Sequence, residues 1–127
     1  MEEEFPLYID MHIVWPGIEE VREIIHRNGG KIFLAHPFHY GKTEIASLLE
    51  KVTPYIDGIE ISNNPKTKEE VIYLHNYAKT HNLLISAGSD YHGEEDYHNL
   101  LTVEDLDQQM EQEISSWTKN CKNLIKK

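Results

Sequence analysis

Three short apolar runs in this 127-residue chain each end in polar residues, and segments of helical periodicity separate them. The runs are Ile32–Ala35, Asp57–Asn63 and Leu83–Ala87. This alternation predicts parallel βα units, because parallel neighbouring strands need a crossover connection between them. In parallel α/β folds, active sites are built at the carboxyl ends of buried strands. We therefore expect an α/β fold whose functional groups follow its strands.

The boundaries of the helices and strands can be read from spacing and from terminating residues. Strands are expected at about 31–36, 57–62 and 83–87, and helices at about 18–28, 44–52, 68–81 and 102–125. Gly29 favours a helix end, because glycine accepts the left-handed conformation after a helix. Thr43 is expected to cap the second helix, and Thr67 with Glu70 has the pattern of a capping box for the third.

The chain is expected to form a single domain with three parts. Residues 1–17 are an extended lead-in, 18–93 the βα core, and 102–125 a long amphipathic helix. The apolar stripe of this last helix consists of Val103, Leu106, Met110, Ile114, Trp117, Cys121 and Leu124. We favour packing of the stripe on the domain's own core, while a surface for a partner chain is the alternative. Cys121 lies within the stripe and is interpreted as a packing residue.

Charge and composition exclude several classes of protein. The chain has 22 acidic and 12 basic residues, a net charge of −10. This balance argues against direct nucleic-acid binding through a basic face. The single cysteine cannot form an intrachain disulfide. The acidic start is unlike a signal peptide, and no apolar run reaches membrane-spanning length. We expect a cytoplasmic protein that does not contact membranes.

Three residues are candidate metal ligands. His36 precedes Pro37, which favours extended backbone, so His36 is expected to continue its strand toward the strand-end cavity. Asp90 and His92 follow the third strand, and carboxylate plus imidazole is a common ligand mixture for zinc, manganese or iron. The alternative for His36 is a hydrogen-bonded strand-end histidine. The alternative for Asp90 and His92 is a polar turn.

Other polar residues near the strand ends are expected to support this site. Glu60 lies within an apolar strand, where an unpaired carboxylate is costly. We favour a role in orienting a metal ligand through a hydrogen bond, with direct metal ligation as the alternative. His39 and Asn63 are candidate substrate contacts at the mouth of the site. Four further histidines are expected at the surface or at helix ends and are given no chemical role: His12, His26, His75 and His81.

The segments 29–38, 57–60 and 88–93 together resemble the later motifs of the polymerase-and-histidinol-phosphatase (PHP) domain family. The order and spacing agree over residues 18–93. The resemblance implies a (β/α)7 barrel with two or three metal ions at its carboxyl rim, commonly zinc, manganese or iron. Family members hydrolyse phosphate monoesters or diesters. The family motifs match three ligands in this chain, namely His36, Asp90 and His92.

The earlier motifs of the family are not found. Residues 10–14 faintly resemble the first, His-x-His, but Val14 stands where its second histidine would be. The chain is therefore expected to supply the last three strands of such a barrel. Three parallel strands cannot close a barrel, so one sheet face, including Ile32 and Leu34, would be exposed. We expect it to be covered by a missing N-terminal half, by self-association or by the C-terminal helix.

The function that these features favour is hydrolysis of a small phosphate ester by metal-activated water. We expect the isolated chain to be an incomplete form of such an enzyme. One alternative is a non-catalytic remnant that serves as a scaffold or partner-binding module. Another is a regulatory domain that binds metal without hydrolysing a substrate.

Overall fold

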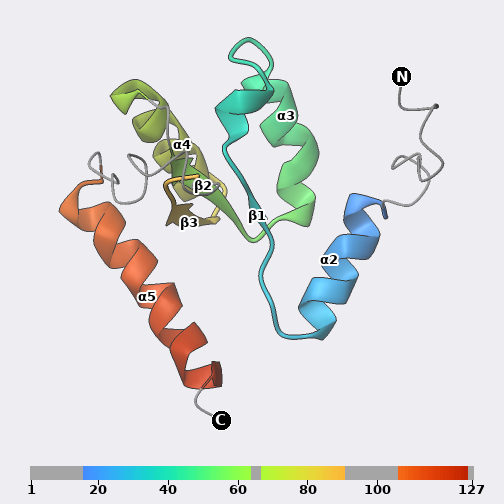
Figure 1. Ribbon diagram of the computed structural model, residues 1–127. Helices are drawn as coiled ribbons and strands as arrows, with labels where there is room; N and C mark the ends of the chain where they lie inside the picture. The colour runs from blue at the N-terminus through green and yellow to red at the C-terminus, as the bar shows by residue number, and fades with distance from the viewer. Residues whose placement is uncertain (1–15, 64–66, 91–105, 126–127) are drawn as a thin grey trace, which may run out of the picture. The chain divides into compact units, whose positions relative to one another are not determined.

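A computed structural model describes residues 16–63, 67–90 and 106–125, with side chains described as far as residue 120. The chain forms two compact units, residues 1–30 and 31–127, whose elements are labelled in Figure 1. Of the extended lead-in expected over residues 1–17, only Pro16 and Gly17 lie within the described residues. The division into a lead-in, a core and a C-terminal helix stays a prediction.

The described part of the first unit contains helix α2, Ile18–Arg27. It ends as the sequence predicts, because Gly29 has a φ of 78°, a left-handed conformation that glycine adopts without strain. Glutamates in its first turn and basic residues in its last turn complement the helix dipole.

The second unit is built on three parallel strands in the order β1-β2-β3. These are β1, Phe33–Leu34, β2, Gly58–Ser62, and β3, Leu84–Ala87. Helix α3, Ile45–Val52, connects β1 to β2, and helix α4, Lys68–Thr80, connects β2 to β3 (Figure 1). The predicted α/β class with parallel βα units is therefore confirmed.

Strand β1 is shorter than the sequence predicts. Before it, the backbone N–H of Ile32 donates to the Asp57 carboxylate at 2.7 Å, a side-chain contact in place of a strand ladder. After it, the chain turns sharply at His36 into a short 3-10 helix, η2, Pro37–Tyr40. The apolar run therefore begins at a side-chain hydrogen bond and ends at a sharp turn, which leaves a short strand between them.

The helix caps agree with the sequence in one case and differ in the other. In α4 the backbone N–H of Glu70 donates to the Thr67 hydroxyl at 3.2 Å, and the Glu70 carboxylate accepts from the backbone N–H of Thr67 at 3.0 Å. This confirms the capping box. The cap predicted at Thr43 is wrong, because Glu44 is the N-cap residue of α3 and no side chain caps that terminus.

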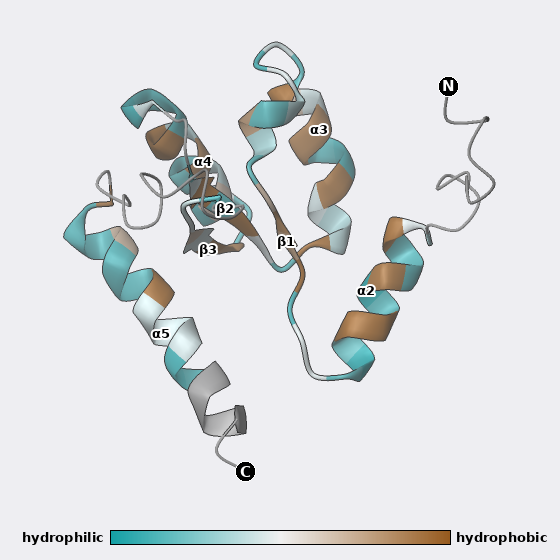
Figure 2. Cartoon of the chain, viewed as in Figure 1, coloured by the Kyte–Doolittle hydropathy of each residue, from teal (hydrophilic) through white to brown (hydrophobic). Residues whose placement is uncertain are grey.

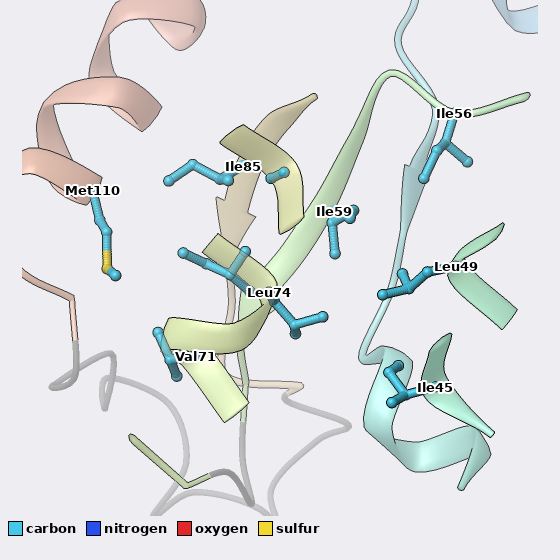
Figure 3. Close-up of a cluster of buried hydrophobic side chains, with 10 residues drawn as sticks. Ile45, Leu49, Ile56, Ile59, Val71, Leu74, Ile85 and Met110 are labelled. Atoms are coloured by element: carbon cyan, nitrogen blue, oxygen red, sulfur yellow. The ribbon is translucent and has the colours of Figure 1, made fainter. Parts of the chain in front are cut away.

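The core lies on the sheet face that carries Ile59 and Ile85, which α3 and α4 cover (Figure 3). Leu34 stands in the same cross-strand row as these two isoleucines, and both Ile32 and Leu34 pack against this core. The prediction that Ile32 and Leu34 would lie on the open face is therefore wrong, because the helices cover their side of the sheet.

The opposite face carries the row Phe33, Gly58 and Leu84. The Phe33 ring lies directly over Gly58, since a Cβ added there would fall 2.2 Å from a ring carbon. Across this face the Phe33 ring meets the indole of Trp117 from the C-terminal helix, with 5.0 Å between ring centroids. The C-terminal helix therefore covers part of this face.

Helix α5, Gln108–Ile125, begins after Asp107, whose carboxylate accepts from the backbone N–H of Met110 at 2.8 Å. The predicted start at Thr102 lies outside the described residues. Although α5 is mainly hydrophilic (Figure 2), Met110 is buried in the core, and Leu106 and Ile114 pack against that core. The expectation that this stripe packs on the domain's own core is confirmed for the described side chains.

Trp117 also protects an edge of the sheet. The backbone N–H groups of Leu84 and Gly88 donate to the β2 side, so the carbonyl of Ile85 faces the opposite, outer edge of β3. The indole N–H of Trp117 donates to that carbonyl at 2.7 Å. An unpaired strand edge is open to pairing with other chains, and α5 closes it here.

His75 joins α4 to α5. Its side chain is buried, and its Nε2 lies 3.0 and 3.2 Å from the two carboxylate oxygens of Glu113. The expectation that His75 is a surface histidine is therefore wrong. Its side chain faces α5, where the carboxylate of Glu113 meets it.

Candidate functional site

His36 follows β1 in an unusual backbone conformation. Its φ and ψ are 31° and 60°, in the left-handed region, so the expected extended backbone is wrong. The chain must turn from the strand into η2 within two residues, and this turn dictates the conformation. Residues other than glycine rarely adopt it, and such strained positions cluster at functional sites.

Glu60 lies between the turns that follow β1 and β3. Its Oε2 accepts the backbone N–H of His36 at 3.2 Å. On the other side, its Oε1 lies only 3.2 Å from where a Cβ on Gly88 would be. Glycine at this position thus leaves room for the carboxylate. The single side chain of Glu60 brings together the two turns that carry predicted ligands.

Burial raises the pKa of the Glu60 carboxyl above the ordinary value of 4.5. The hydrogen bond from the His36 backbone and the charges of His36 and His39 act in the opposite direction, whereas the negative charge of Asp90 adds to the effect of burial. The electrostatic neighbours of Glu60 are therefore three of the residues that the sequence assigns to the site.

The His36 imidazole is the best placed of the predicted ligands. Its ring stacks on the His39 ring, with 4.6 Å between centroids. Its Nδ1 is buried and has no hydrogen-bond partner within the described part of the chain. A buried polar atom without a hydrogen bond is costly, and a neutral imidazole nitrogen is a common metal ligand. This donor atom fits a divalent metal ion.

Asp90 follows Gly88 and Ser89 in a second left-handed position, with a φ of 55°. Aspartate is among the few residues other than glycine that tolerate this region. The third predicted ligand, His92, lies outside the described residues. Within the ranges that are described, no group of three or more histidine, cysteine, aspartate or glutamate side chains is arranged to hold a metal ion.

Asn63 is buried in the wall of the site. A cavity of about 10 Å³, close to the space of one water molecule, is lined by His36, Glu60 and Asn63 together with residues of η2 and α4. The Asn63 amide nitrogen has no hydrogen-bond partner among the described residues. The other predicted substrate contact, His39, is exposed next to His36.

Tyr40 is a neighbour of the site that sequence reasoning missed. It is 56% exposed, and its ring centroid lies 5.6 Å from that of His36. The signal was an aromatic residue four positions after His36. Only the 3-10 turn of η2, which folds residues 37–40 back beside His36, shows that the two rings are neighbours.

Replacing Glu60 by glutamine is expected to stabilise the metal-free chain, increasingly so as the pH rises. The folded chain holds the Glu60 proton more tightly than the unfolded chain, so the wild type loses stability from about pH 4.5 upward, through the raised pKa. Glutamine keeps an acceptor for the His36 N–H but has no charge to desolvate. Urea unfolding at several pH values, in the presence of a chelator, measures this difference.

The matched control is Glu50→Gln, at an exposed glutamate on α3. A stability difference for Glu60→Gln that is constant over pH 4 to 8 would contradict the assignment of the effect to desolvation of this carboxylate.

The comparisons with known proteins identify partial relatives. No family model matches the chain. The 5'-3' exoribonucleases Rnm of Salmonella typhimurium and Escherichia coli are each 32% identical to it over 83 residues, which cover 61% of this chain and 28% of theirs. A 5'-3' exoribonuclease of Haemophilus influenzae is 33% identical over 81 residues, covering 61% of this chain and 30% of its own length.

The chain therefore spans less than a third of the length of the curated relatives that it matches. Among the described helices, none combines the length and the apolar composition needed to cross a bilayer.

Proposed function

We propose that this chain supplies part of the active site of a metal-dependent phosphoester hydrolase of the PHP type. The observation that carries the proposal is the buried Nδ1 of His36, which has no hydrogen-bond partner in the described part of the chain and lies at the carboxyl end of the sheet. Glu60 contacts the His36 turn and approaches the turn that leads to Asp90. The motifs in the sequence and the partial relatives support the same reaction class.

The substrate that we propose is a phosphoester of RNA or of a nucleotide. The relatives are named as 5'-3' exoribonucleases, and cleavage of RNA is hydrolysis of a phosphodiester. The chain corresponds to less than a third of those proteins, so we assign their activity to it only as a proposal.

In this proposal His36, Asp90 and His92 hold zinc, manganese or iron, which when bound activates water and neutralises charge on the phosphoryl oxygens. Glu60 fixes the backbone of His36 through the N–H bond and so holds the imidazole in position. His39, exposed and stacked on His36, contacts the phosphoryl group of the substrate.

The remaining ligands would come from a further polypeptide segment or a second copy of the chain. Because α5 closes the outer edge of β3, the edge of β1 is where further strands would add to this sheet. The alternative of a scaffold that contacts its partner through α5 is less favoured, because Met110 and Trp117 are engaged with the domain's own core and sheet.

Removal of the His36 imidazole is expected to weaken metal binding by at least about tenfold, the lower end of the losses seen when a metal site is disturbed. Metal per chain is measured first by elemental analysis of protein purified without chelator or metal-affinity resin. Calorimetric titration with Zn²⁺ or Mn²⁺ then compares the wild type, His36→Ala and the control His26→Ala on α2.

Equal metal affinity for the wild type and His36→Ala would remove His36 from the site and with it the proposed function. Two results together would support the proposed function. His36→Ala loses metal affinity while the control His26→Ala does not. The protein also hydrolyses p-nitrophenyl phosphate or a 5'-phosphorylated oligoribonucleotide only when metal is added.

A further inference from the structure

Tyr40 presents an exposed aromatic ring beside the candidate site. The segment from His36 to Tyr40 gathers three rings, since His36 contacts both His39 and Tyr40. A large aromatic side chain that is 56% exposed leaves its ring accessible to a ligand. The centroids of the Tyr40 ring and the His36 imidazole are 5.6 Å apart, a separation that one nucleotide can span.

A groove of about 350 Å³ adjoins this ring on the side of α3. It is lined by Tyr40, Gly41, Glu44, Ser47, Leu48 and Lys51. Leu48 offers an apolar surface, while Glu44, Ser47 and Lys51 provide an acceptor, a hydroxyl and a cationic donor. Such a lining suits a flat ring with hydrogen-bonding groups on its edge.

A turn at Gly41 and one ion pair shape the loop that carries Tyr40. Gly41 has a φ of 122°, a conformation that side-chain-bearing residues rarely adopt and that turns the chain away after η2. Lys42 then pairs with Glu70 at the start of α4, at 3.2 Å. Although an ion pair with an exposed lysine adds little stability, it connects the loop to α4, the helix that covers the sheet.

We propose that Tyr40 and this groove bind the base of a nucleotide whose phosphate lies at His36. The inference rests on the proposed function and deepens it, because it assigns the residues that would hold the base of the proposed RNA or nucleotide substrate. Stacking on an aromatic side chain is tolerant of base identity, because every base has a π-face. A sugar phosphate has no aromatic base to stack on Tyr40.

Base stacking also removes a difficulty that the charge of the chain presents. A net charge of −10 opposes binding to the phosphate backbone of a nucleic acid. Recognition of a single terminal nucleotide by stacking needs no basic surface. Binding of the base is therefore expected to depend only weakly on salt concentration.

The test uses 2-aminopurine riboside 5'-monophosphate, whose fluorescence is quenched when its base stacks. The full chain is titrated with this probe in chelator, so that hydrolysis does not interfere. Tyr40→Ala is expected to bind the probe about tenfold or more weakly, while Tyr40→Phe keeps the affinity of the wild type. Adenosine 5'-monophosphate should displace the probe, and ribose 5-phosphate should not.

Three outcomes would each overturn the inference. The wild type does not bind the probe, or Tyr40→Ala binds it as tightly as the wild type does. In the third outcome, ribose 5-phosphate displaces the probe as efficiently as the nucleotide does. A failure of the proposed function is distinct from these outcomes. In that case the protein shows no metal-dependent hydrolysis, and His36→Ala leaves the metal affinity unchanged. Tyr40→Ala would still weaken binding of the probe.

Discussion

Alanine at Gly58 is expected to destabilise the second unit by about 3 kcal/mol, at the upper end of the usual cost of overpacking. The added Cβ would lie 2.2 and 2.6 Å from two carbons of the Phe33 ring and 2.8 Å from the backbone carbonyl of Leu84. The ring could move aside only by leaving Trp117, and the carbonyl belongs to the neighbouring strand. The free energy of unfolding in urea measures this cost.

Gly17→Ala is the control, because a Cβ there meets nothing within 4 Å. A double variant with Phe33→Leu separates the two contacts. Relief of the ring clash should restore part of the lost stability, while the contact with the Leu84 carbonyl remains, so the two substitutions should be non-additive. A loss for Gly58→Ala no larger than that for Gly17→Ala would contradict the described packing of Phe33 over the strand.

Removal of the Trp117 side chain is expected to cost about 2–3 kcal/mol, less than for a fully buried tryptophan because this one is half-buried. The indole contributes the contact with Phe33 and the hydrogen bond to the Ile85 carbonyl. Its loss exposes both the open sheet face and the outer edge of β3. Trp117→Ala is therefore expected to associate or aggregate more readily, which light scattering detects alongside urea unfolding.

Trp117→Phe separates packing from hydrogen bonding. It keeps a ring against Phe33 but leaves the Ile85 carbonyl without its donor, so about 1 kcal/mol should be lost. Tyr40→Ala serves as a control for loss of an exposed aromatic ring and should change stability by about 0.5 kcal/mol or less. An unchanged stability in Trp117→Ala would mean that the contacts of Trp117 with Phe33 and with the Ile85 carbonyl do not stabilise the fold in solution.

Local signals in the sequence were reliable where a single turn of chain decides the structure. The capping box of Thr67 and Glu70 and the helix end at Gly29 depend on residues within four positions of each other, and both are present. Thr43 failed as a cap by one residue, since α3 starts at Ile45 with Glu44 before it. A shift of one residue in the start of a helix changes which side chain occupies the N-cap position, and the local pattern near Thr43 does not fix that residue.

The face of a strand, by contrast, could not be read from its sequence. Ile32, Phe33 and Leu34 are all apolar, so alternation gives no sign of which side the helices cover. The register decides it, by placing Leu34 in a row with Ile59 and Ile85 and Phe33 in a row with Gly58. The same holds for His75, which is buried and meets Glu113 of α5, a contact that local sequence does not reveal.

By itself the sequence determined the class of fold, the approximate extent of its helices and the identity of the polar residues after each strand, because these follow from periodicity and local chain stereochemistry. The tertiary structure decided which of those residues meet. Glu60 reaches the His36 backbone and the space left by Gly88 because parallel pairing aligns the ends of three strands. The left-handed turn at His36 and the exposed ring of Tyr40 beside it depend on how strand, turn and helix pack together, and no local pattern contains that information.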